Sequence, residues 1–143
     1  MIWEIQSYAG VGPIIFGMQR IAVQKLFEEK PNSFFKADQI TLTDYYTQAG
    51  VFVYYDETEA CNAVEFTKPA NVKWQEKQLL SLPLGKLRDY MRSQDNMLEE
   101  DESGFTSYKN GVGGYTEDID DLDESVETII CFQQGYYATA LIS

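Results

Sequence analysis

The residues with the greatest capacity for chemistry are the carboxylates of one short acidic segment, residues 117–124. Carboxylate oxygens are ligands that Ca²⁺ prefers, and an exposed group of them also attracts basic proteins. An EF-hand loop that began at Asp118 would need an oxygen ligand where Leu122 stands and a glycine where Asp123 stands. The EF-hand pattern therefore fails. Three interpretations remain: a calcium site of another kind, a solvated loop, or an acidic surface that docks a basic partner and mimics nucleic-acid phosphates.

Negative charge is concentrated in the C-terminal third of the chain. The 143 residues carry a net charge of −12, and residues 95–127 alone contribute −11, because twelve acidic side chains there face the single base Lys109. A field of one sign repels nucleic acid and anionic lipid, and it steers basic proteins toward the surface. We therefore expect no binding to nucleic acid or to membranes, and a basic protein as the partner.

Enzymatic chemistry has weak support in the sequence. The chain has no histidine, which is the commonest general base and the commonest transition-metal ligand. It also lacks the motifs of a serine nucleophile elbow, a phosphate-binding loop and a Cys-x-x-Cys site. A hydrolase with paired carboxylates remains an alternative, because 23 acidic residues permit many pairings. We expect a non-catalytic protein with no cofactor and no metal, and keep a calcium-binding structural or regulatory module as a second alternative.

Tyrosines near the acidic segment could supply the apolar contacts of a docking surface. Interfaces favour tyrosine because its rigid ring buries a large area while its hydroxyl forms a hydrogen bond. Strands also use tyrosine in routine packing, which accounts for at least half of the ten tyrosines in the chain. The candidate partner-binding residues are Tyr108, Tyr115, Glu117, Asp118, Asp120, Asp121, Asp123, Glu124, Tyr136 and Tyr137.

Two helices and seven strands would position these residues. Apolar spacing predicts one helix over residues 17–27 and a second over residues 81–91, with Ser81 at the N-cap of the second. The buried stripe of the first helix would contain Met18, Ile21, Ala22 and Leu26. Runs of β-branched and aromatic residues predict strands at 39–47, 51–55, 61–66, 72–75, 105–108, 111–116 and 126–132.

The chain divides into two similar units, each a helix followed by strands. Residues 49–56 and 110–117 both begin with a glycine turn and continue into a strand, an acidic loop and a further strand. Each unit alone is too small to bury its apolar face. We therefore predict one α+β domain over residues 1–143, with unit one at about 10–78 and unit two at about 79–143. The two units suggest a tandem repeat, with the helices on one face of an antiparallel sheet.

Residues 10–18, Gly-Val-Gly-Pro-Ile-Ile-Phe-Gly-Met, precede the first predicted helix. This segment resembles the opening of small bacterial immunity-type and uncharacterised proteins, in which a G-x-G-P-x-x-F-G-M motif leads into helix one. The repeated plan of helix and strands is also similar to the beta-lactamase-inhibitory-protein-like fold, and residues 49–56 and 135–137 extend the similarity over most of the chain. The resemblance implies a bacterial protein that binds other proteins. Combined with the charge, it leads us to expect an immunity protein that neutralises a basic toxin, such as a nuclease.

The compartment is inferred from segments that the sequence lacks and from its cysteines. No apolar run is long enough to span a bilayer, and the first residues show neither the basic nor the apolar region of a secretory signal. Cys61 and Cys131 lie in apolar, strand-like runs, so we expect buried free thiols. The expected localisation is the cytoplasm.

Overall fold

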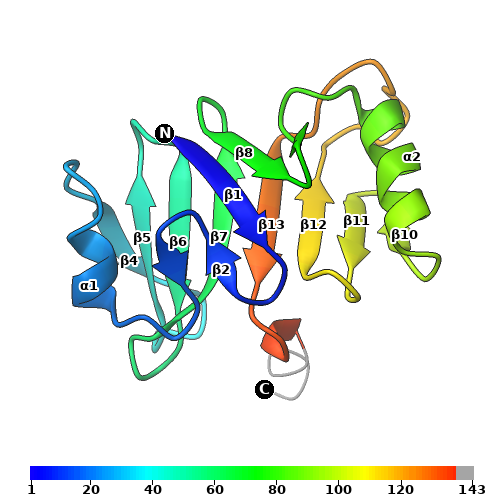
Figure 1. Cartoon of the computed structure of the whole chain (residues 1–143). Helices are drawn as coiled ribbons and strands as arrows, with labels where there is room; N and C mark the ends of the chain where they lie inside the picture. The colour runs from blue at the N-terminus through cyan, green and yellow to red at the C-terminus, as the bar shows by residue number, and fades with distance from the viewer. Residues whose placement is uncertain (138–143) are drawn as a thin grey trace.

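The computed structural model describes residues 1–137 and contains two β-sheets and two short helices (Figure 1). This arrangement confirms the predicted α+β class. The larger sheet is antiparallel and has eight strands in the order β10-β11-β12-β13-β7-β6-β5-β4. Their bounds are β4 Asn32–Phe35, β5 Leu42–Tyr46, β6 Val51–Tyr55, β7 Cys61–Thr67, β10 Glu99–Asp101, β11 Gly104–Ser107, β12 Val112–Tyr115 and β13 Thr128–Phe132.

The smaller sheet has five strands in the order β3-β2-β1-β8-β9, and its β1 and β8 are parallel. Their bounds are β1 Ile2–Gln6, β2 Gly10–Val11, β3 Ile14–Ile15, β8 Asn71–Trp74 and β9 Lys77–Gln78. The helices are α1 Arg20–Gln24 and α2 Leu84–Gln94. Within residues 1–137, neither helix is long and apolar enough to cross a lipid bilayer.

The last strand that each half of the chain contributes to the larger sheet lies at the centre of that sheet. Strands β7 and β13 pair there in antiparallel register, with Glu65 opposite Ile130. From this seam β6, β5 and β4 extend to one side, and β12, β11 and β10 extend to the other in the mirrored order. Strands of the two halves therefore occupy matching places on either side of the seam.

One face of the larger sheet carries the core. The smaller sheet crosses this face at its centre, α1 lies at the β5 end, and α2 lies at the β10 end (Figure 1). The Trp3 ring of β1 contacts the ring of Phe66 on β7, and the Phe27 ring stacks between those of Trp3 and Tyr46. Side chains alternate in and out along β6, where Val51, Val53 and Tyr55 are buried.

The first helix differs from its prediction. Residues 17–19 are instead bound to the start of β7. The Gly17 N–H donates to the Cys61 carbonyl, the Cys61 N–H donates to the Met18 carbonyl, and Gln19 is extended and bridges to Ala60. The helix therefore begins only at Arg20, and residues 10–15 form β2 and β3 ahead of it. Its buried residue is Val23, whereas Ile21, expected on the buried face, is 67% exposed.

The second helix begins three residues later than predicted. Pro83, and not Ser81, occupies the N-cap, where it provides no side-chain hydrogen bond. The Ser81 hydroxyl instead bonds to Gln78. The helix continues past the predicted end to Gln94 and buries Leu84, Leu87 and Met91.

Most predicted strands are present, with ends that shift by a few residues. The segments expected at 51–55, 61–66 and 105–108 correspond to β6, β7 and β11. The segment expected to begin at residue 39 is shorter, because the Asp38 carboxylate accepts the N–H groups of Ile40 and Thr41 and forms a turn there. Strands β1 to β4, β9 and β10 are additional, so the second sheet is a correction to the predicted single sheet. Both cysteines are free and buried, as expected.

Candidate functional site

One face of the eight-stranded sheet points away from the smaller sheet and the helices, and we call it the open face (Figure 1). Its side chains alternate with the core residues along each strand. The strand registers place one residue of every strand in a single row across this face. The row contains Asn32, Tyr45, Phe52, Glu65, Ile130, Gly113, Thr106 and Glu99.

The half of the open face that belongs to β4–β6 is an aromatic ridge, formed by Tyr45, Phe52 and Tyr54. The Tyr45 and Phe52 rings are stacked with their centroids 3.9 Å apart, and the Tyr54 ring lies 6.5 Å from that of Phe52. The Lys36 ammonium lies 4.4 Å from the centre of the Tyr54 ring. Because stacking and cation–π contacts hold these rings, the ridge is a rigid apolar surface.

The half that belongs to β10–β12 is hollow at the matching places. Gly113 takes the place of Phe52 in the row, and Thr106 takes the place of Tyr45. The small side chains leave a groove of about 730 Å³ on the sheet surface. The acidic groove, as we name it, is lined by Glu65, Glu99, Glu100, Asp101, Ser103, Gly104, Phe105, Thr106, Tyr108, Gly113, Gly114, Tyr115, Thr128, Ile130 and Tyr137.

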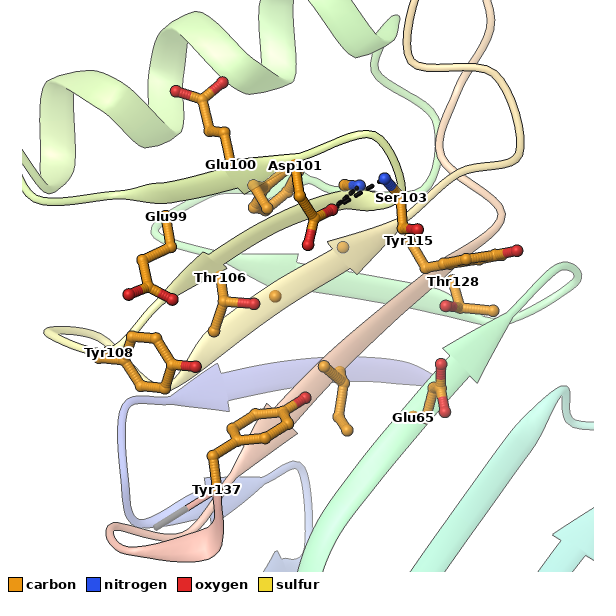
Figure 2. Close-up of a pocket in the computed structure, with 15 residues that line it drawn as sticks. Glu65, Glu99, Glu100, Asp101, Ser103, Thr106, Tyr108, Tyr115, Thr128 and Tyr137 are labelled. Atoms are coloured by element: carbon orange, nitrogen blue, oxygen red, sulfur yellow. Dashed lines mark hydrogen bonds between the residues drawn. The ribbon is translucent and has the colours of Figure 1, made fainter. Parts of the chain in front are cut away.

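Three carboxylates and three tyrosines give the groove its chemical character (Figure 2). Glu65 lies on the seam side, and Glu99 and Asp101 lie on the side of the edge strand β10 (Figure 2). The rings of Tyr108, Tyr115 and Tyr137 stand around the space between them (Figure 2). None of the described residues that line the groove is basic. The groove is therefore a site of negative potential with aromatic walls.

Hydrogen bonds fix two of these carboxylates in place. Asp101 accepts the backbone N–H groups of Ser103 and Gly104 at 2.8 and 3.0 Å, and both bonds reach the same oxygen. Glu65 accepts the Tyr54 hydroxyl, so the ridge supports the groove. A fourth acid, Glu100, is already paired with Arg92 of α2 at 2.8 Å. The charge offered to a ligand therefore resides on Glu65, Glu99 and Asp101.

Two of the groove tyrosines, Tyr108 and Tyr137, are hydrogen-bond donors at neutral pH. Burial, followed by the charge of Glu65, raises the pKa of Tyr137 to about 12. Burial and the nearby Glu99 also raise the pKa of Tyr108. Both hydroxyls therefore stay protonated, and the groove presents neutral donors beside its carboxylates.

The structure divides the residues predicted from the sequence into three groups. Tyr108, Tyr115 and Tyr137 line the acidic groove. Tyr136 lies next to them, with its ring 5.1 Å from that of Tyr137 and 5.4 Å from the Lys36 ammonium. The acidic loop continues the negative surface beyond Tyr115, where Glu117, Asp118 and Asp120 line a shallow depression, while Asp121, Asp123 and Glu124 are exposed further along the loop.

The second part of the acidic loop covers the start of α2. The Leu84 N–H donates to the Glu124 carbonyl at 2.7 Å, and the Gly85 N–H donates to the Leu122 carbonyl at 3.0 Å. These carbonyls satisfy two of the helix N–H groups that have no partner within the helix. This part of the loop therefore has a structural role.

Sequence reasoning did not identify Glu65, Glu99 and Asp101 as site residues. The alternation along residues 61–67 does place Glu65 on the face opposite Phe66. It could not show that β13 would bring Tyr137 beside it. Within residues 1–137, no three acidic or cysteine side chains gather in a way that could hold a metal ion, so the calcium alternative gains no support there.

Comparisons of the chain with protein-family models, with curated proteins and with solved structures returned no match.

Proposed function

We propose that this protein binds a basic segment of another protein on its open face and acts without catalysis. The observation that carries the proposal is the acidic groove, in which Glu65, Glu99 and Asp101 surround a space walled by tyrosines. A lysine or arginine side chain fits this chemistry, because carboxylates give charge-assisted hydrogen bonds and tyrosine faces attract cations.

The aromatic ridge beside the groove supports the same proposal. Interfaces derive most of their binding energy from a few buried aromatic and arginine anchors. Tyr45 and Phe52 offer rigid rings for apolar contact, and the groove offers a place for a cation. The partner would therefore present a basic side chain next to an apolar patch, with the acidic loop steering its approach.

An inhibitor of a basic toxin is the class of binder that we propose, as an immunity protein acting in the cytoplasm. The concentrated charge of residues 95–127 suits a protein that occupies the cationic substrate site of an enzyme such as a nuclease. The buried free thiols of Cys61 and Cys131 suit a reducing compartment. The mirrored strand order around the seam supports an internal duplication of the chain.

A fluorescent arginine-containing peptide tests the binding mode by anisotropy. Wild-type protein is compared with a groove variant that combines three substitutions, Glu65→Gln, Glu99→Gln and Asp101→Asn. The matched control is a loop variant that combines Asp118→Asn, Asp120→Asn and Asp121→Asn, and it removes the same charge from the acidic loop. We expect the groove variant to weaken binding by about tenfold or more, and the loop variant to weaken it by only about threefold, because exposed charges are screened.

Two results would contradict the proposal. Equal losses in the two variants would mean that the peptide responds to net charge and not to the groove. Unchanged binding by Tyr115→Ala, at fixed salt, would remove the aromatic wall from the interface. The inhibitory role is tested separately: co-expression with basic toxins encoded in the same genome should restore growth, and the groove variant should restore it less.

A hydrolase is the second candidate, because Glu65 lies across the groove from Glu99 and Asp101 (Figure 2). It predicts turnover of aryl glycosides that the single variant Glu65→Gln abolishes. Absence of turnover by the wild-type protein at any pH between about 4 and 7 would remove this candidate.

A further inference from the structure

The two edges of the eight-stranded sheet are chemically opposite. The edge strand β10 consists of Glu99, Glu100 and Asp101, so it carries only acidic side chains. The other edge strand, β4, consists of Asn32, Ser33, Phe34 and Phe35 and carries no charge. Charged side chains on an edge strand prevent pairing with another chain, whereas an uncharged and apolar edge invites it. The β4 edge therefore has no charged side chain of its own that would prevent pairing with another strand.

The apolar side chains of β4 are freely accessible. Phe34 is 46% exposed and Phe35 is 56% exposed, and all four residues of the strand are classed as exposed. Among residues 1–137, β4 pairs on one side only, with β5. Its outer backbone groups have no strand partner in that part of the chain. A partner strand would satisfy these groups and cover both rings.

The register of β4 shows which backbone groups point outward. The Lys36 N–H donates to the Thr41 carbonyl at 2.8 Å, which makes these two residues a hydrogen-bonded pair. Such pairs alternate in an antiparallel ladder, so Phe34 and Asn32 also direct their backbone groups toward β5. The N–H and C=O groups of Ser33 and Phe35 therefore point away from the sheet.

We propose that two copies of this chain pair their β4 strands in antiparallel register about a twofold axis at Phe34. Ser33 then lies opposite Phe35 of the second copy, and Phe35 opposite its Ser33, so that all the outward donors and acceptors are used. The two Phe34 rings meet at the axis on the open face, where aromatic pairs stabilise cross-strand contacts. Lys36 lies opposite an uncharged Asn32, so no like charges oppose each other.

The charge distribution favours this edge as the place where two copies of the chain can pair. The net charge of −11 in residues 95–127 belongs to the β10 end of the sheet, whereas residues 1–94 carry a net charge of only −1. Pairing through β4 places the two acidic ends as far apart as the sheet allows, which minimises repulsion. Antiparallel pairing also keeps the two open faces on one side, so the dimer presents two acidic grooves on one continuous surface.

Sedimentation velocity on the full chain tests the proposal, with protein from about 1 μM to about 1 mM, since a contact of this size is expected to be weak. The mass should rise from 16.4 kDa toward that of a dimer, and added salt should favour the dimer by screening the acidic ends.

Phe34→Glu should abolish the association. Phe35→Pro should also abolish it without unfolding β4, because the N–H that proline lacks points outward. Met97→Glu, at a side chain that is 79% exposed near β10, is the matched control and should associate like the wild type.

Cross-linking gives a second and independent measurement. The native thiols of Cys61 and Cys131 are buried, so a thiol introduced by Phe34→Cys is the only accessible one among the described residues. We expect this variant to form a disulfide-linked dimer many times faster than Met97→Cys under the same oxidant. A monomer at every concentration, a dimer that persists in Phe35→Pro, or equal cross-linking of the two variants would each overturn the proposal.

Discussion

Arg20 and Asp44 connect helix α1 to strand β5 through a bidentate ion pair. The guanidinium donates from Nη2 to Oδ1 at 2.9 Å and from Nε to Oδ2 at 3.1 Å. The Asp44 side chain is fully buried, and it also accepts the Ser33 hydroxyl at 2.7 Å and the Gln24 amide at 3.1 Å. This one carboxylate therefore joins α1, β4 and β5.

Loss of the Arg20 guanidinium should strongly destabilise the fold. The substitution Arg20→Ala leaves a buried carboxylate without its cation, which costs about 3 kcal/mol of unfolding free energy. Urea denaturation followed by tryptophan fluorescence measures the change. Arg92→Ala is the matched control, because it breaks an exposed pair with Glu100 and should leave the midpoint nearly unchanged. Equal midpoints for the two variants would contradict this role of Arg20.

Acid should destabilise the protein partly through Asp44. Burial alone would raise the pKa of this carboxyl, but the hydrogen bonds from Arg20, Ser33 and Gln24 outweigh burial and hold the pKa below its usual value. A carboxyl with a lowered pKa contributes stability above its unfolded pKa of about 3.9 and loses that contribution as the pH falls through the folded value. The urea midpoint of wild-type protein should therefore fall below about pH 4, and the fall should be smaller in Asp44→Asn.

The control for the acid experiment is a second buried acid. Asp95 accepts the Ser107 hydroxyl at 2.8 Å, and its pKa is also lowered despite its burial. The Asp44→Asn protein should therefore keep part of the acid sensitivity. An unchanged pH profile in Asp44→Asn would show that Asp44 is not one of the groups that titrate on unfolding.

Two adjacent glycines in β12 should respond differently to alanine. A Cβ at Gly114 would lie 2.7 Å from the buried Phe105 ring, so Gly114→Ala should destabilise the fold by about 1–3 kcal/mol. A Cβ at Gly113 has its nearest contacts at 3.1 and 3.3 Å and points into the acidic groove. Gly113→Ala should therefore cost less stability but weaken the binding of the arginine peptide. Thermal unfolding and anisotropy measure the two effects, and the reverse order of stabilities would refute the packing argument.

Helix α2 contains a position where alanine should stabilise the protein. A Cβ at Gly85 would touch the Leu122 side chain at 3.4 Å, which is ordinary van der Waals contact. Alanine also has a higher helix propensity than glycine, so Gly85→Ala should raise the unfolding free energy by about 0.5–1 kcal/mol. Chemical denaturation checks the value. A loss of stability would mean that the loop carbonyls over α2 have been displaced.

The sequence predicts the long elements of this fold well because their patterns are local. The alternation along β6 and the Asn110-Gly111 turn between β11 and β12 are readable without tertiary information. Strands β2 and β3 are two residues long and show no periodicity. In β1 the buried Trp3 and Ile5 alternate with exposed neighbours, but one of these neighbours is the apolar Ile2, which hides the alternation in the sequence.

The candidate site was predicted only in part because it depends on pairing between distant segments. The tyrosines at positions 108, 115 and 137 were identified from their nearness to acidic residues in the sequence, and they line the groove. Glu65 joins them through the pairing of β7 with β13, which no local pattern encodes. The late start of α1 has the same cause, since Gly17 and Met18 bond to Cys61 and the Arg20 N–H donates to the Glu59 carbonyl.

The central position of β13 has a consequence for how the protein is made. This strand is translated after the other strands of the sheet, yet β7 and β12 both depend on it for their backbone hydrogen bonds. A nascent chain that has not reached residue 132 leaves the apolar β7 with a bare edge, a state prone to aggregate. Folding of the sheet on the ribosome should therefore remain incomplete until residue 132 has been synthesised, and premature termination within the acidic loop should yield insoluble product.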